Sequence, residues 1–117
     1  MEDRNFIIYK SSAGSGKTYT LTMEYLKLAL KFPDSFKSIL AVTFTNKATA
    51  EMKERIIKEL KRLKHTVQPD QKMDRELLDG LKISEEELKS RAAQVLTAIL
   101  HDYGRFSVST IDSFFQK

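Results

Sequence analysis

Residues 11–18, Ser-Ser-Ala-Gly-Ser-Gly-Lys-Thr, have the residue types and the spacing of a phosphate-binding loop. The segment follows a short apolar run and precedes a stretch with helical periodicity. Backbone N–H groups of such a glycine-rich turn converge on a phosphate, and the helix dipole adds favourable potential. Lys17 would reach the β- and γ-phosphates, and the Thr18 hydroxyl would hold Mg²⁺. The spacing therefore predicts a nucleoside triphosphate site.

This predicted nucleotide site departs from the usual pattern at one position, because Ser11 replaces the first glycine. The alternative interpretation is an ordinary flexible turn that ends in a lysine. We expect Lys17 and Thr18 to be the catalytic residues, with Thr18 as the Mg²⁺ ligand through the nucleotide. The nucleotide-binding residues are Ser12, Ala13, Gly14, Ser15, Gly16, Lys17, Thr18 and Tyr19.

A second polar cluster, Thr43–Asn46, ends another apolar run. Open parallel sheets place ligands at the carboxyl ends of their strands. Hydroxyl and amide groups beside a helix N-terminus can hold a backbone phosphate there. Phe44 is equally compatible with stacking on a base and with core packing. Thr45 or Asn46 is also expected to cap the following helix, and a cap can share its helix end with a phosphate.

The elements that must position these residues alternate between strand and helix. This order predicts an α/β fold with right-handed crossovers and a parallel sheet covered on both faces. A capping box at Ser84 and Glu87 opens one helix, Gly80 ends another, and an apolar stripe from Leu88 to Tyr103 predicts core packing. We expect strands at 5–9, 38–44 and 106–110, and helices at 17–30, 47–64, 73–79 and 84–102.

Composition excludes several classes of protein. The 117 residues contain no cysteine, which excludes disulfide scaffolds and thiolate metal sites. No apolar run is long enough to span a bilayer, and the cytoplasm is the expected location. Segment 46–64 has seven basic and three acidic side chains, so it alone accounts for the net charge of +4. A nucleic-acid partner and a solvated helix face explain this cluster equally well. His65 and His101 are expected to be structural.

Two motifs resemble the UvrD/Rep-like helicases of superfamily one. The first is Thr-Phe-Thr-Asn-Lys-Ala at 43–48, followed by an Ala/Glu/Met/Arg-rich helix, and the second is Ser-Thr-Ile-Asp-Ser-Phe-Phe-Gln at 109–116. The serine-rich phosphate loop and the second motif look most like the RecB/AddA branch of helicase–nucleases. The resemblance implies a P-loop NTPase fold, RecA-like and three-layered (α/β/α), with ATP and Mg²⁺ as cofactors. It implies DNA contacts at Thr43, Phe44, Thr45, Asn46, Lys47, Thr110 and Ser113.

On this resemblance, residues 1–117 form the N-terminal part of the first motor domain, with a helical insertion at about 58–100. The implied partners are single-stranded DNA, the remaining helicase domains and a second helicase–nuclease subunit. Many relatives place a glutamine before the phosphate loop to read adenine, whereas no glutamine precedes Gln68 here, so the resemblance does not extend to selectivity for adenine. Asp112 stands where many relatives have histidine, and we expect it to cap a last helix. With no strand-end acid pair, the chain is expected to bind ATP without appreciable hydrolysis. A small phosphate-loop kinase and a non-enzymatic nucleotide-sensing or DNA-binding module are the alternatives.

Overall fold

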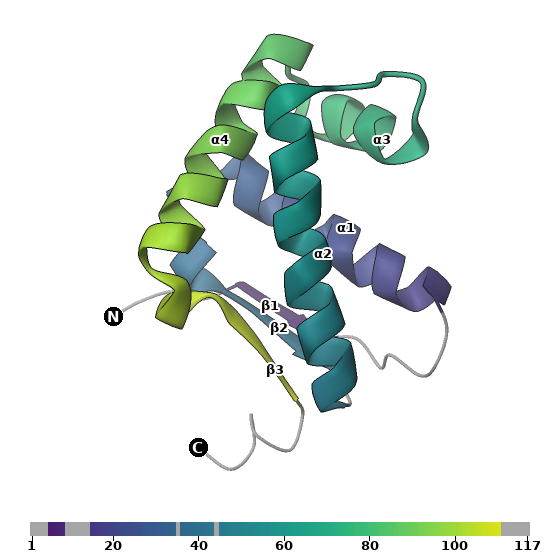
Figure 1. Cartoon of the computed structure of the whole chain (residues 1–117). Coiled ribbons are helices and arrows are strands. Elements are labelled where there is room, and N and C mark those ends of the chain that lie inside the picture. Colours follow the sequence, from purple (N-terminus) through teal and green to yellow (C-terminus); the bar gives the residue numbers. More distant parts are fainter. Residues whose placement is uncertain (1–4, 9–14, 35, 44, 111–117) are drawn as a thin grey trace.

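The computed structural model describes residues 5–8, 15–34, 36–43 and 45–110, with side chains from Tyr19 onward except that of Ser109 (Figure 1). Its elements alternate much as the sequence pattern predicts. In chain order they are β1 (Asn5–Ile8), α1 (Ser15–Lys31), the 3-10 turn η1 (Phe36–Ser38), β2 (Ile39–Thr43), α2 (Asn46–His65), α3 (Lys72–Leu81), α4 (Glu85–His101), the 3-10 turn η2 (Tyr103–Arg105) and β3 (Ser107–Thr110).

The three described strands form one sheet in the order β1-β2-β3, and both pairs are parallel. Asn5 pairs with Ile39 in the first ladder, and Leu40 pairs with Ser107 in the second. All five residues of β2 are buried, as expected of a central strand in a parallel sheet. The predicted α/β class and parallel sheet are therefore confirmed, whereas the RecA-like three-layer arrangement stays a prediction.

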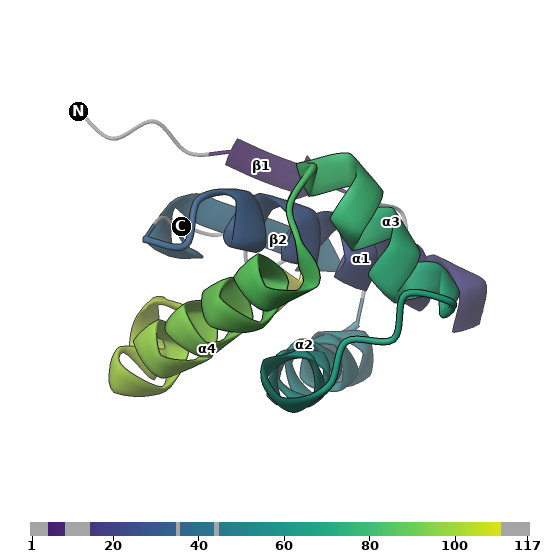
Figure 2. The same ribbon diagram turned by 90° about the horizontal axis from the view of Figure 1, so that it is seen from above.

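The core lies between the sheet and the helices. Helix α1 contacts β1 and β2, α2 contacts β2 and β3, and the two helices contact each other. Figure 2 shows α2 and α4 on the same side of α1, away from β1. The apolar stripe of α2 faces this core, because a 3.6-residue period keeps positions three and four apart on one face. Its buried members are Met52, Ile56, Leu60 and Leu63.

The region expected to be a helical insertion contains the end of α2, all of α3 and nearly all of α4. The buried residues of these helices belong to the same hydrophobic core as those of the sheet. Helix α4 packs against α2, and α3 packs against α1. Leu77 and Leu88 are both fully buried. The segment therefore contributes directly to covering α1 and α2.

Two local expectations at the helix ends need correction. Gly80 does not end α3, because the helix continues to Leu81 and the left-handed cap is Lys82, with φ 56°. The N–H of Lys82 donates to the carbonyl of Leu78, so the extra turn is hydrogen-bonded. Half of the capping box forms, since the Ser84 hydroxyl accepts from the N–H of Glu87. The carboxylate of Glu87 accepts from Arg91 at 2.8 Å instead of closing the box.

Candidate nucleotide and nucleic-acid site

The carboxyl ends of β2 and β3 lie beside the first turn of α2 (Figure 1). Thr43 and Thr110 are partners in the parallel ladder, so two residues 67 positions apart in sequence occupy one edge of the sheet. Both side chains are buried, with 2% and 8% of their surfaces exposed. The structure therefore brings together the two predicted DNA-contacting segments, as far as their described residues extend.

The threonines at the start of α2 form a compact hydrogen-bonded corner. The hydroxyl of Thr43 lies 2.7 Å from that of Thr49 and donates to the carbonyl of Thr45 at 3.2 Å. Thr45 is the N-cap, and its side chain accepts from the N–H of Ala48 at 3.0 Å. This confirms the expected cap. A cap of this kind fixes the direction in which the first turn of α2 presents its remaining N–H groups.

The predicted DNA contacts divide by exposure. Thr45, Asn46 and Lys47 are exposed, while Thr43 and Thr110 are buried beneath them. Phe44 and Ser113 lie outside the described residues, as does Asp112. The exposed part of this corner offers a hydroxyl, an amide and an ammonium group next to a helix N-terminus. That combination suits an anionic oxygen.

Helix α1 begins at Ser15, within the predicted phosphate loop. Residues 11–14 lie outside the described part of the chain, and Lys17 and Thr18 are described by their backbone alone. The first four N–H groups of a helix have no partners within it, so those of residues 15–18 are available to an anion. The first turn contains no acidic residue, and the helix follows a strand of the parallel sheet. These features fit the triphosphate and Mg²⁺ of the prediction.

Tyr19, the last residue of the predicted nucleotide site, packs partly against the core. Its hydroxyl is buried and has no hydrogen-bond partner among the residues that the structure describes. Burial raises the pKa of Tyr19, and the negative charges of Glu76, Glu59 and Asp74 raise it further. The ammonium group of Lys72 lies 5.8 Å from the ring centroid. Tyr19 thus connects the start of α1 with α3. No motif in the sequence indicated that α3 lies beside this residue.

Arg62 does not belong to a free basic surface. Its guanidinium donates to both oxygens of Asp74, at 2.7 and 2.9 Å, and to Glu59 at 3.0 Å. The Asp74 side chain is fully buried and also accepts from the N–H of Gln68 at 2.7 Å. The hydrogen bond with Asp74 contributes most to raising the pKa of Arg62, against the opposing effect of burial. These hydrogen bonds link α3 to α2. They also engage the charge of Arg62, which therefore differs in its contacts from the lysines of the same helix.

The apolar stripe from Leu88 to Tyr103 was predicted to pack in the core, and this prediction is wrong at its last residue, Tyr103. It lies in η2, beyond α4, and 46% of its surface is exposed. The ring makes an edge contact with Phe106 at 5.8 Å, and the ammonium of Lys53 lies 5.2 Å from its centroid. The sequence signal for this position was only a lone aromatic residue before a glycine. His65 and His101 are exposed in the last turns of α2 and α4.

Between residues 5 and 110, apart from the gaps at 9–14, 35 and 44, no three His, Cys, Asp or Glu side chains are grouped to hold a metal ion. No helix in the described part of the chain has the length and apolar character needed to cross a membrane.

Comparison with known proteins gives consistent similarities. Residues 2–116 match the model of the UvrD/REP helicase N-terminal domain. RecB of the RecBCD enzyme of Escherichia coli is 32% identical over 118 residues, covering 94% of this chain and 10% of the relative. An ATP-dependent helicase/nuclease of Lactobacillus johnsonii is 35% identical over 108 residues, covering 92% and 7%. ATP-dependent DNA helicase UvrD1 of Mycobacterium tuberculosis is 45% identical over 51 residues, covering 44% and 7%.

The matches differ in how much of the chain they cover. The Escherichia coli RecB and Lactobacillus johnsonii helicase/nuclease sequences align with nearly the whole chain, whereas a second RecB, a second helicase/nuclease subunit and UvrD1 each align with less than half of it. The chain spans a tenth or less of the length of each of these relatives. No solved structure is significantly similar to it.

Proposed function

Because the chain belongs to the UvrD/REP helicase family and is RecB/AddA-like, we propose that it is an ATP-binding and single-stranded-DNA-contacting segment of a helicase motor domain. The proposed fold is a P-loop NTPase, RecA-like, to which residues 1–117 contribute the first strands and helices. The family match over residues 2–116 is the observation that carries the proposal.

The nucleotide half of the proposal assigns roles to the loop before α1. The N–H groups of residues 14–18 hold the β- and γ-phosphates, Lys17 neutralises them, and Thr18 is the Mg²⁺ ligand. When bound beside Thr18, Mg²⁺ would supply positive charge that offsets the charge of the phosphates. Support comes from the start of α1 at Ser15 and from the absence of acid in its first turn. Tyr19 lies beside this end of the helix and supports its packing against α3.

The DNA half assigns phosphate contacts to the exposed corner at Thr45, Asn46 and Lys47. We infer that Thr43 orients this corner through Thr49, because its hydroxyl is buried and hydrogen-bonded. Thr110, its ladder partner, supports the same edge. Phe44 and Ser113 complete the proposed contact set.

The parent protein is proposed to be an ATP-dependent helicase, and one component of a helicase–nuclease in particular. This rests on the relatives named RecB of the RecBCD enzyme and ATP-dependent helicase/nuclease, both of which align with over nine tenths of the chain. An assembly with a second helicase–nuclease subunit follows from the same names. The corresponding location that we propose is the cytoplasm, where such a protein would process DNA.

Calorimetric titration with ATP and Mg²⁺ tests the nucleotide half. Lys17→Ala should remove most of the affinity, because it deletes the charge that faces the phosphates. Lys31→Ala is the matched control, since Lys31 is an exposed lysine in the last turn of the same helix. Equal ATP affinity in the Lys17 variant and the wild type would refute the nucleotide site. Anisotropy with an oligothymidylate and Asn46→Ala tests the DNA half, for which we expect weakened binding.

A further inference from the structure

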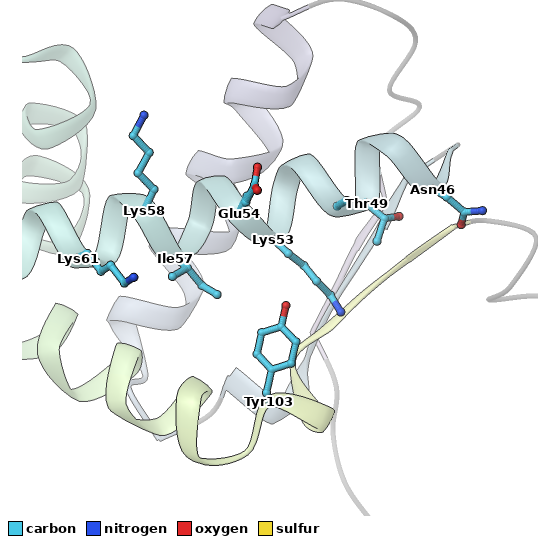
Figure 3. Close-up of a pocket in the computed structure, with 9 residues that line it drawn as sticks. Asn46, Thr49, Lys53, Glu54, Ile57, Lys58, Lys61 and Tyr103 are labelled. Carbon is cyan, nitrogen blue, oxygen red and sulfur yellow. The ribbon is translucent and has the colours of Figure 1, made fainter.

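An open groove of about 700 Å³ runs along the exposed side of α2, and Tyr103 of η2 lines it beside Lys53 and Ile57 (Figure 3). It begins at Asn46 and Thr49, the corner proposed above to hold a DNA phosphate, and reaches Lys61 about four turns later. Lys53 and Ile57 point from α2 toward Tyr103, whereas Lys58 and Glu54 project on the other side of the helix (Figure 3). The groove is thus continuous with the proposed site.

The charge of the groove is positive. Lys53, Lys58 and Lys61 line it together with one acid, Glu54. None of the three lysines forms an ion pair with any residue that the structure describes, although Lys53 lies over aromatic rings. The arginines of α2 lie elsewhere, since Arg55 and Arg62 line a separate pocket with Tyr19. Lys53 and Lys61, which share the helix face of Ile57 at four-residue spacing, therefore present positive charge that suits a polyanion, and Lys58 lies on the opposite rim of the groove.

Tyr103 adds an aromatic surface to this positive charge. Its ring is held by edge contact with Phe106, of which only 2% is exposed, so the ring has a defined orientation. Nearly half of the residue remains accessible at the groove. An exposed ring beside lysines is the combination that proteins use to bind single strands, because a base stacks on the ring while its phosphate meets the charge. A duplex does not expose its base faces in this way.

We propose that this groove binds single-stranded DNA, with a base stacked on Tyr103 and the backbone held by Lys53 and Lys61. The inference rests on the proposed function, which it extends from the corner at Asn46 along α2. The distance from Asn46 to Lys61 is about 22 Å at about 1.5 Å per residue. That length accommodates about six nucleotides at the spacing of one duplex strand, and fewer when the strand is extended.

Fluorescence anisotropy of the 117-residue chain with a labelled oligothymidylate of about 12 nucleotides tests the proposal. Tyr103→Ala should weaken binding by about 5- to 150-fold, which corresponds to the loss of one stacked base. Tyr103→Phe should retain wild-type affinity, because the ring is kept. Lys61→Ala should weaken binding and reduce the slope of log affinity against log salt by about 0.7. Lys64→Ala, which removes an exposed lysine of α2 outside the groove, should leave that slope nearly unchanged.

The outcomes separate this inference from the proposed function. If Asn46→Ala weakens binding while Tyr103→Ala and Lys61→Ala do not, the corner contacts DNA and the groove proposal is wrong. Equal or tighter binding of a duplex of the same length also overturns the groove proposal. If the wild type binds no oligothymidylate at about 50 mM salt, both the groove and the DNA half of the proposed function are refuted. Far-UV circular dichroism of each variant verifies that it is folded.

Discussion

Replacing Arg62 by alanine should destabilise the fold more than replacing its partner Asp74 by alanine. The two substitutions differ in the charged group that each leaves without its partner. Asp74 is fully buried and accepts three hydrogen bonds, two from Arg62 and one from the N–H of Gln68. Arg62 is one third exposed and has a second partner in Glu59 at 2.9 Å. Loss of the arginine therefore leaves a buried carboxylate with one donor, whereas loss of the aspartate leaves a partly solvated, paired guanidinium.

The expected magnitudes follow from this difference. Breaking a buried pair so that one charge remains uncompensated costs about 3–5 kcal/mol, and Arg62→Ala meets that condition. Asp74→Ala removes charged hydrogen bonds without stranding a buried charge, so we expect a cost of about 1.5–3 kcal/mol. The difference between the variants is then about 2 kcal/mol, which is a large share of the roughly 5–15 kcal/mol that stabilises a typical domain.

Urea unfolding followed by far-UV circular dichroism measures this difference. With an m-value of about 2 kcal/mol/M, the midpoint for Arg62→Ala should lie about 1 M below that for Asp74→Ala. Arg75→Ala is the control, because Arg75 pairs with Asp79 at 3.3 Å in an exposed position and should cost less than about 1 kcal/mol. The reasoning is refuted if Asp74→Ala costs as much as Arg62→Ala, or if neither differs from the control.

Two other substitutions test the core and a helix. Tyr25→Phe should stabilise the protein by about 1 kcal/mol, because the buried Tyr25 hydroxyl has no partner in the described part of the chain while the ring contact with Phe106 is kept. Burial raises the pKa of Tyr25 above 10.0, so wild-type stability should fall as the pH rises past about 10, and urea titrations should find this fall reduced in the variant. Gly80→Ala should raise the melting temperature, with a gain of about 0.5–1 kcal/mol, because an added Cβ meets only Lys27 Cε at 3.6 Å. A loss of stability in either variant would contradict the described packing.

Short-range chemistry makes much of the fold predictable from the sequence. The apolar stripe of α2 follows from its period, and the four buried residues of the helix all belong to that stripe. The caps at Thr45 and Ser84 are predictable because they involve residues three positions apart. The strand-helix alternation predicts the parallel sheet for a related reason, since parallel strands need long crossovers. The phosphate loop and the motif at 43–48 indicate the family that the comparison then identified.

The sequence by itself thus determined the elements, most of their caps and the family. The tertiary structure alone decided which charges are free. Arg62 and the lysines of α2 are indistinguishable as neighbours in one basic segment, but α3 covers the first and leaves Lys58 and Lys61 exposed. Tyr103 continues an apolar stripe, yet the chain turns at η2 and carries its ring out to the groove. The physical reason is that periodicity reports which side chains share a face of one helix, whereas exposure depends on which other element packs against that face.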